Sequence, residues 1–259
     1  MEKSMPQKLV SEFVGTLTLI FIGAGSFLAA SVVPQGAGLV TYALAYGLAV
    51  ATMVSALGHV SGGHFNPAVT IGVWIAQKIK SSDAVGYIAA QLAGASAGAL
   101  LLRLALPKGL WDQPQLALGT PQVVTGISNG QAVLIEAILT FFLVWVVFGA
   151  AVDPEGSSGK TAGLAIGFVI VMGVMMGGPF TGAAMNPARH FGPMLLSWTT
   201  KGWWVYWIGP VAGGIVAAAL YDGVILRKKE ATLPPEEAPH GVGAYGDDAH
   251  GDDEIPAAE

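Results

Sequence analysis

The chain has 259 residues, of which 53% are apolar and 11% are charged, and it contains 36 glycines and no cysteine. Soluble domains carry about 25% charged residues, so this composition indicates a membrane protein and excludes an ordinary soluble enzyme. Without cysteine the chain has no disulfide bonds and no thiolate chemistry. The formal charge of −5 comes from the C-terminal tail, because residues 230–259 hold nine acidic residues and no Lys or Arg.

Six apolar segments are long enough to cross a hydrocarbon core of about 30 Å, which takes roughly 20 helical residues. The first exceeds the apolar part of a signal peptide, about 7 to 15 residues, so we interpret it as a membrane helix. The six spans are predicted near residues 9–33, 38–58, 83–105, 129–151, 160–178 and 202–226.

Basic residues near the ends of the spans predict the orientation. Eight fall on one side of a six-span arrangement and three on the other, which indicates that both termini lie in the cytoplasm. The larger group is Lys3, Lys8, Lys78, Lys80, Lys160, Arg227, Lys228 and Lys229, and the smaller group is Arg103, Lys108 and Lys201.

The chain contains an internal repeat. The stretch AYGLAVATMVSALGHVSGGHFNPAV, ending at Val69, aligns without a gap on AIGFVIVMGVMMGGPFTGAAMNPAR, ending at Arg189. EFVGT from Glu12 matches EAILT from Glu136, and LAG at 92–94 matches VAG at 211–213. With three spans in each unit, the second unit enters the membrane from the opposite side, so the repeats are inverted.

Two copies of Asn-Pro-Ala interrupt the apolar sequence, in HFNPAV at 64–69 and AMNPAR at 184–189. Proline suits the first position of a helix, so each copy predicts a new helix start. Residues 66–78 and 186–197 are each long enough for about 18 Å of helix, half of the membrane core. In an inverted pair these half-helices enter from opposite faces, and their N-terminal N–H groups converge near the midplane. The glycine-rich segments before them, 61–64 and 177–184, are predicted to be non-helical.

The predicted fold is therefore an all-α membrane protein with six transmembrane helices and two re-entrant half-helices in an inverted repeat. We expect a channel domain over residues 1–226, with repeat one at about 8–105 and repeat two at about 129–226. Residues 227–259 form an acidic tail whose Pro- and Gly-rich composition is typical of disorder, and we assign it no chemistry. Glycine pairs at 94 and 98, and at 209 and 213, are expected to let helices approach closely within the monomer.

The stretches GHVSGGHFNPAVT and TGAAMNPARHFGP closely resemble the major intrinsic proteins, the aquaporin and aquaglyceroporin family, of bacterial or archaeal type. The resemblance runs from about residue 8 to 226. It implies that Asn66 and Asn186 donate hydrogen bonds to passing oxygens and that His64 lines the pore. The residues that it implies for stacking of the half-helices are Pro67, Ala68, Pro187 and Ala188. The alternative is that each Asn is only the N-cap of an ordinary helix.

The resemblance also implies a narrow filter formed by Tyr46, Val174, Ala183 and Arg189. Strict water channels of the family usually carry His where Val174 stands, and glycerol facilitators usually carry Trp at Tyr46 and Phe at Ala183. This sequence matches neither pattern, so a wider and less polar constriction is expected. Tyr206 and Trp207 resemble the water branch, whereas His190 replaces the Ser or Asp that usually follows the Arg and is not informative.

Two intramembrane carboxylates, Glu12 and Glu136, support two interpretations. As a proton relay they would belong to an ion-coupled secondary transporter, a class that also uses broken helices and inverted repeats. The family resemblance instead makes them acceptors for backbone N–H groups of the re-entrant loops. We favour this bracing role, because buried irregular backbone needs hydrogen-bond partners.

The predicted function is a passive channel for water that also passes glycerol or other small neutral solutes and excludes ions and protons. We expect no enzyme activity, cofactor, metal site or nucleic-acid partner. A purely structural role, as in junction-forming relatives, is the further alternative. The protein is expected to span the cell membrane, the inner or plasma membrane, several times, and the resemblance implies a homotetramer in the lipid bilayer.

Overall fold

The structure is a computed structural model that describes residues 3–33, 38–156 and 161–226. The predicted acidic tail and four basic residues used for the orientation, Lys160, Arg227, Lys228 and Lys229, lie outside the described residues. Within the described ranges the chain forms helices joined by loops, and no strand occurs there.

Six helices are long and apolar enough to cross a membrane. Short terminal π-helical turns extend two of them. The spans are α1 (Met5–Ala30), α2 (Leu39–Ser61), α4 (Ser81–Ala105), α6 (Asn129–Val147) with η2 (Phe148–Val152), α7 (Ala162–Thr181), and α9 (Val205–Leu220) with η3 (Tyr221–Leu226).

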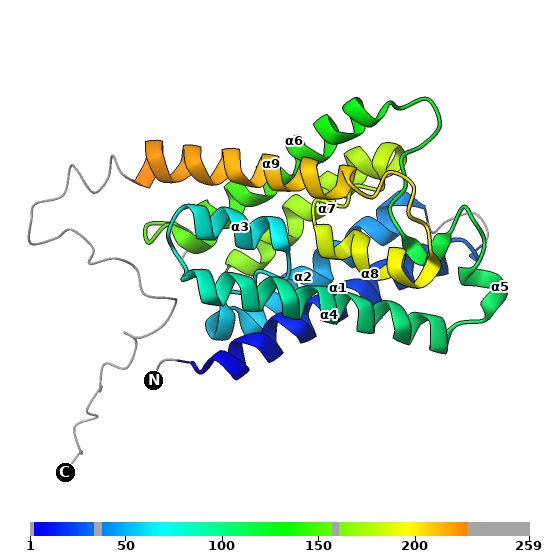
Figure 1. Ribbon diagram of the computed structural model, residues 1–259, viewed down its shortest axis with the longest axis horizontal. Helices are drawn as coiled ribbons and strands as arrows, with labels where there is room; N and C mark the ends of the chain where they lie inside the picture. The colour runs from blue at the N-terminus through cyan, green and yellow to red at the C-terminus, as the bar shows by residue number, and fades with distance from the viewer. Residues whose placement is uncertain (1–2, 34–37, 157–160, 227–259) are drawn as a thin grey trace, which may run out of the picture.

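Four shorter elements complete the fold. The half-helices are α3 (Pro67–Ile75) and α8 (Pro187–Ser197), and the connection between the repeats holds α5 (Lys108–Trp111) and η1 (Ala117–Gly119). In Figure 1, α3 lies in the half of the molecule where α1 begins, and α8 lies in the opposite half. The end of η3 lies at the same end of the molecule as the start of α1 (Figure 1). The predicted all-α fold with six spans and two re-entrant half-helices is confirmed.

The two repeats interlock through their half-helices. Helix α1 packs against α2 and α4, and α6 packs in the same way against α7 and α9. The two halves meet where α2 packs on α7. Each half-helix then lies on the last helix of the other repeat, α3 on α9 and α8 on α4. A half-helix is therefore held by both repeats, which fixes its position near the centre.

Glycines bring the first and last spans of each repeat into backbone contact. A Cβ atom on Gly94 would lie 2.3 Å from the carbonyl oxygen of Phe13, so α4 touches the backbone of α1 there. A Cβ atom on Gly213 would lie 2.0 Å from the carbonyl oxygen of Ala137, so α9 touches α6 in the same way. The expectation that these small-residue faces build the core of the monomer is confirmed.

The first half-helix is shorter than predicted. It ends at Ile75 rather than near Lys78, which leaves nine residues, or about 14 Å of helix. Gln77 adopts a left-handed conformation with φ 60°, and the N–H of Lys78 donates to the carbonyl of Val73 at 3.0 Å. This hydrogen bond closes the helix end in the usual left-handed cap. The residues after Ile75, Ala-Gln-Lys, do not mark the stop, because they include no glycine or proline.

Helix α7 is longer than predicted. The segment 177–184 was expected to be non-helical, yet α7 continues through Pro179 to Thr181. Gly177 and Gly178 leave room for Leu139 and Leu39, whose side-chain carbons would lie 2.4 Å and 2.9 Å from Cβ atoms on these glycines. This packing favours the helix over the turn that the Gly-Gly-Pro sequence suggests locally.

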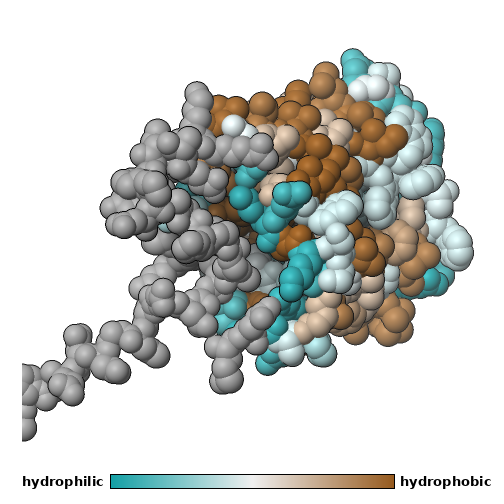
Figure 2. All heavy atoms as spheres, turned by 60° about the vertical axis from the view of Figure 1, so that its left-hand side comes forward, coloured by the Kyte–Doolittle hydropathy of each residue, from teal (hydrophilic) through white to brown (hydrophobic). Residues whose placement is uncertain are grey.

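The outer surface is apolar. Large apolar side chains on several helices are exposed, among them Leu104, Val85 and Met172. Figure 2 shows hydrophobic residues, in brown, along the side of the molecule, and hydrophilic residues, in teal, gathered mainly toward its two ends. An apolar side surface between polar ends suits a protein that spans the membrane several times.

Candidate functional site

Two short loops lead into the half-helices, and left-handed glycines begin both. Gly62 has φ 88° and ends α2, and Gly182 has φ 82° and ends α7. Phe65 and Met185, the residues before the two Asn-Pro-Ala sequences, also have positive φ, 48° and 51°. Residues with side chains rarely adopt this conformation, so the surrounding packing must hold both loops in place.

Asn66 and Asn186 begin the half-helices. The Oδ1 atom of Asn66 accepts a hydrogen bond from the N–H of Ala68 at 2.9 Å, and the Oδ1 atom of Asn186 accepts one from Ala188 at 2.9 Å. Each Asn is therefore an N-cap, followed by a proline at the first helical position. The capping role uses only the side-chain oxygen, so the amide nitrogen of each Asn is free for another partner.

The amide nitrogens join the two repeats. Nδ2 of Asn66 donates to the carbonyl oxygen of Met185 at 2.8 Å, and Nδ2 of Asn186 donates to the carbonyl oxygen of Phe65 at 2.9 Å. Each Asn thus bonds to the residue that precedes the other Asn. An ordinary N-cap makes no such bond, so the pair has a second role beyond capping. One amide hydrogen on each Nδ2 is left over, because an Asn amide has two.

The four predicted filter residues come together from four segments of the chain. They are Tyr46 on α2, Val174 on α7, Ala183 in the second loop and Arg189 on α8. The guanidinium carbon of Arg189 lies 4.1 Å from the centre of the Tyr46 ring, which is the geometry of a cation–π contact. Nε and Nη1 of Arg189 are buried and have no hydrogen-bond partner among the described residues.

All of these residues line one cavity with about 480 Å³ of empty space, including its open part. The lining includes the polar residues His64, Asn66, Asn186 and Arg189. Most of the other lining residues are apolar, among them Leu19, Val50, Val69, Leu143, Val147, Ile166, Ile170 and Val174. A few donors on an otherwise apolar wall suit a small neutral solute that carries acceptor oxygens.

Glu136 is fully buried beside the second loop. Its carboxylate accepts hydrogen bonds from the N–H groups of Ala184 at 2.9 Å and Met185 at 2.7 Å. It also accepts one from the hydroxyl of Thr181 at 2.7 Å. Three donors therefore point at this carboxylate from the loop and from the end of α7.

Glu12 occupies the matching position beside the first loop. Its carboxylate accepts hydrogen bonds from the N–H groups of His64 at 3.0 Å and Phe65 at 2.7 Å. It also accepts bonds from the Ser61 hydroxyl at 2.6 Å and from Nε2 of Gln91 at 2.7 Å. The structure thus brings each glutamate together with the loop of its own repeat.

Two tyrosines support the loops; sequence reasoning missed Tyr87 and named Tyr206 only as a marker of the water branch. The Tyr87 hydroxyl donates to the carbonyl of Ser61 at 2.9 Å, and the Tyr206 hydroxyl donates to the carbonyl of Thr181 at 2.8 Å. Their positions in the two repeats match, and that correspondence was a signal that could have found them. His190 is fully buried and stacks on Tyr206, with ring centres 4.2 Å apart.

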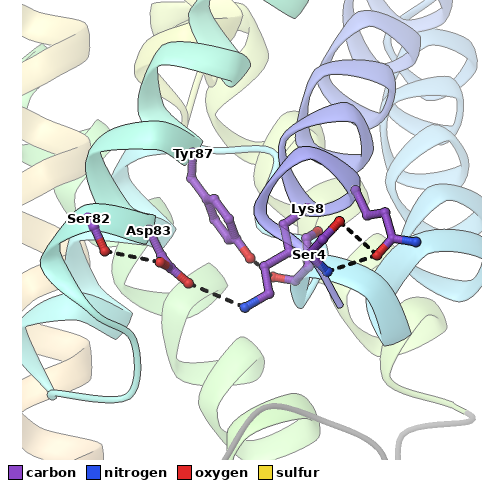
Figure 3. Close-up of polar contacts among 7 residues, drawn as sticks. Ser4, Lys8, Ser82, Asp83 and Tyr87 are labelled. Carbon is purple, nitrogen blue, oxygen red and sulfur yellow. Dashed lines mark hydrogen bonds and ion pairs between the residues drawn. The ribbon is translucent and has the colours of Figure 1, made fainter. Parts of the chain in front are cut away.

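An ion pair joins α1 and α4 near the tyrosine that supports the first loop. Figure 3 shows Lys8 of α1 reaching Asp83 of α4, with the Tyr87 ring one turn further along α4. The Nζ to Oδ2 distance is 3.3 Å, and both side chains are largely buried. Ser82 contacts the same carboxylate at 3.2 Å. The ion pair joins α1 to α4 close to Tyr87, the tyrosine that supports the first loop.

The chain matches a known protein family over most of its length. The family model described as "Major intrinsic protein" matches residues 1–221. "Probable aquaporin TIP3-2" of Arabidopsis thaliana is 41% identical over 246 residues, covering 89% of this chain and 87% of the relative. "Aquaporin TIP4-4" of Zea mays is 42% identical over 225 residues, covering 85% and 87%.

A solved structure is also similar. "X-ray structure of the aquaglyceroporin from Plasmodium falciparum" superposes with a TM-score of 0.77 at 27% identity, covering 88% of this chain and 100% of that chain. The two relatives named above are plant proteins. The bacterial or archaeal type suggested by the sequence stays a prediction.

Proposed function

This chain belongs to the major intrinsic protein family and is a passive membrane channel for water and small solutes, and we propose that its pore is the cavity between the half-helices. Members of this family are channels and not enzymes. The membership also favours passive flow over the alternative of an ion-coupled transporter. The protein crosses the membrane several times.

The observation that carries the pore proposal is the reciprocal bond between the asparagines and the two loops. Each Nδ2 donates one hydrogen to a carbonyl of the opposite loop, and its second hydrogen can be donated to a passing oxygen. Two donors held at the meeting point of two helix N-termini orient a water oxygen and repel cations, as is established for this family. Arg189 adds a positive charge in the same cavity.

We assign Glu12 and Glu136 to bracing of the loops rather than to proton transfer. Each carboxylate already accepts three or four hydrogen bonds from donors around it. A proton carrier must exchange its hydrogen-bond partners during transport, which these buried bonds oppose. Loss of the carboxylate would leave several buried N–H groups without an acceptor, at about 1–3 kcal/mol each.

We propose that water passes fastest and that glycerol passes more slowly but measurably. Val174 and Ala183 supply small apolar walls at the filter, which leaves space that a strict water filter lacks. Tyr46 limits that space, because its ring is held in place by close packing against Arg189 and Gly23. The width of the filter is therefore set by the side chains of Val174, Ala183 and Tyr46, which line one cavity.

Three finer features complete the proposal. We place the channel in the cell membrane, inner or plasma, with both termini in the cytoplasm, on the basis of the asymmetry in basic residues. We propose a homotetramer with one pore in each subunit, which rests on the family resemblance. Crosslinking or native mass measurement of the protein in detergent tests the tetramer, and a purely monomeric species contradicts it.

Stopped-flow light scattering on proteoliposomes tests the proposed function. A sucrose gradient should shrink vesicles containing the protein much faster than empty vesicles, with an activation energy close to that of free water diffusion. A glycerol gradient should give a slower reswelling that empty vesicles lack. Planar bilayers containing the same protein should carry no proton or ion current.

A surface variant provides the matched control. Leu134 is exposed on α6 and lies outside the cavity, so Leu134→Ala should leave both rates unchanged. Shrinkage no faster than that of empty vesicles contradicts water conduction. Glycerol exclusion as strict as that of empty vesicles contradicts the wide filter alone.

A further inference from the structure

The first repeat contains a chain of hydrogen bonds that links a loop-bracing carboxylate to the cavity wall. Nε2 of Gln91 lies 2.7 Å from Oε2 of Glu12 and 2.9 Å from Oγ1 of Thr70. Oγ1 of Thr70 lies 3.1 Å from Nδ1 of His64. Gln91 and Thr70 are fully buried, so solvent does not compete for these bonds. His64 is only partly buried and lines the cavity.

The second repeat lacks this chain. At matching positions, His190 stands for Thr70, Ala184 for His64 and Pro210 for Gln91. Glu136 nevertheless accepts both loop N–H groups in the second repeat without any of these partners. The loops can therefore be braced without the chain. The side chains of Gln91 and Thr70 serve something that only the first repeat has, and that is the imidazole of His64.

The number of hydrogens available on each group decides which group donates in each of these hydrogen bonds. Glu12 accepts from four donors, so its carboxylate has no hydrogen to pass on. Both hydrogens of the Gln91 amide are then used, one on Glu12 and one on Thr70. The Thr70 oxygen accepts the second of these, and its single hydroxyl hydrogen is left for the remaining neighbour, Nδ1 of His64. An imidazole nitrogen that accepts a hydrogen bond carries no proton.

We propose that Gln91 and Thr70 are positioning residues that fix His64 as the Nε2–H tautomer, so that the channel wall presents a hydrogen-bond donor at this point. Among the described residues the His64 ring forms its hydrogen bond through Nδ1 and none through Nε2, and His64 is one of the residues that line the cavity. His64 then joins Asn66 as a second donor for solute oxygens on the same wall. This consequence for permeation rests on the proposed function, whereas the tautomer does not.

If Nδ1 of His64 donated instead, the buried Thr70 hydroxyl would keep a partner for its own hydrogen only with the Gln91 amide turned over. Its oxygen would then face Glu12 and Thr70, Glu12 would have to carry a proton, and His64 would hold its proton on Nδ1. The amide NH₂ would occupy the place of Oε1, which is buried without a partner among the described residues. Two unpaired hydrogens replace one unpaired acceptor, and Glu12 loses an acceptor site needed by the loop. The hydrogen-bond network therefore favours the first direction.

Nitrogen NMR of the full-length protein in liposomes, labelled with ¹⁵N-histidine, tests the proposal. The chain has five histidines, and His64→Asn identifies the signal of His64 by its disappearance. Wild-type protein should show a protonated Nε2 and an unprotonated Nδ1. Thr70→Val, which removes the donor to Nδ1, should make an Nδ1-protonated form appear, and Thr70→Ser should restore the wild-type signal.

Thr18→Val is the matched control, because the Thr18 hydroxyl donates to a carbonyl of its own helix on the exposed face. It should leave the His64 signal unchanged. An Nδ1-protonated His64 in wild-type protein overturns the proposal, even where Thr70→Val fails to fold. An unchanged His64 signal in folded Thr70→Val protein overturns it as well.

Water transport separates this proposal from the proposed function. Thr70→Val should lower the osmotic permeability per channel by roughly two- to tenfold, the effect of losing one hydrogen bond of typical net strength, while Thr70→Ser should not. A wild-type protein that conducts no water contradicts the proposed function and leaves the tautomer measurement standing. A conducting wild type with the opposite tautomer contradicts only the role of Gln91 and Thr70.

Discussion

Gly47 of α2 and Gly167 of α7 lie against one another's backbone at matching positions of the two repeats. A Cβ atom on Gly47 would come within 2.5 Å of the carbonyl oxygen of Gly167, and one on Gly167 would come within 2.6 Å of the carbonyl oxygen of Gly47. Real Cβ atoms essentially never lie so close to a backbone oxygen. The two repeats therefore meet at a point where only glycine fits on both sides.

Gly167→Ala should destabilise the protein, because the added methyl group forces α2 and α7 apart. The expected loss is about 1–3 kcal/mol, the usual range for overpacking a core. Thermal unfolding in detergent, followed by loss of tryptophan fluorescence or of a monodisperse elution peak, measures the effect. Gly130→Ala on α6 is the control, since a Cβ atom there would meet no described residue beyond its own helix backbone within 4 Å. Equal melting temperatures for the two variants would contradict the argument.

Val174→His should reduce glycerol flux while water continues to pass. The imidazole adds bulk and a polar group to the wall of the cavity that Arg189 and Tyr46 also line. Paired sucrose and glycerol stopped-flow experiments on the same vesicles give the ratio of the two rates. An unchanged glycerol rate in the variant means that the constriction lies elsewhere along the cavity.

Glu136→Gln should lose stability and water permeability together. A glutamine oxygen cannot replace both carboxylate oxygens for Thr181, Ala184 and Met185, and its NH₂ group would face an N–H donor. The cost is about 1–3 kcal/mol for each donor left unpaired. Unfolding temperature and osmotic permeability measure the two effects.

The same variant separates bracing from proton transfer. An imposed pH gradient should drive no solute uptake in the wild-type protein, so Glu136→Gln has no proton-coupled uptake to abolish. Proton-coupled uptake that is present in the wild type and absent in a stably folded variant would support a transporter instead.

Mercuric ions should leave water permeability unchanged, because the chain has no cysteine to bind them. Val174→Cys should make the channel sensitive, since residue 174 lines the cavity on the helical part of α7. Leu134→Cys, on the exposed face of α6, should stay insensitive. Inhibition is read as a slower sucrose-driven shrinkage that a thiol reagent reverses, and block of the wild-type channel would exclude a thiol mechanism.

Local signals in the sequence determined the architecture. Apolar length gave the six spans, the repeat gave their inverted relation, and proline after Asn66 and Asn186 marked the starts of both half-helices. These features depend on the preferences of a few neighbouring residues and on hydropathy, so they can be read without knowing what packs against them.

Tertiary packing decided the details that local preferences leave open. Helix α3 stops at Ile75 because Gln77 turns left-handed, although no glycine or proline follows to mark the end. Helix α7 runs through Pro179 because its glycine face packs on Leu39 and Leu139. In both places contacts or backbone closure outweigh the intrinsic tendency of the segment.

The bonds that unite the site were also decided by the tertiary structure. Asn66 reaches Met185 and Gln91 reaches Glu12, partners that lie 119 and 79 positions apart in the chain. The family resemblance implied that the glutamates accept from N–H groups of the loops and that the asparagines donate, but it did not identify which loop N–H groups are bound or that each asparagine bonds to the opposite loop. A hydrogen bond depends on distances of a few tenths of an ångström, and only the packing of six helices around two interlocked half-helices sets those distances.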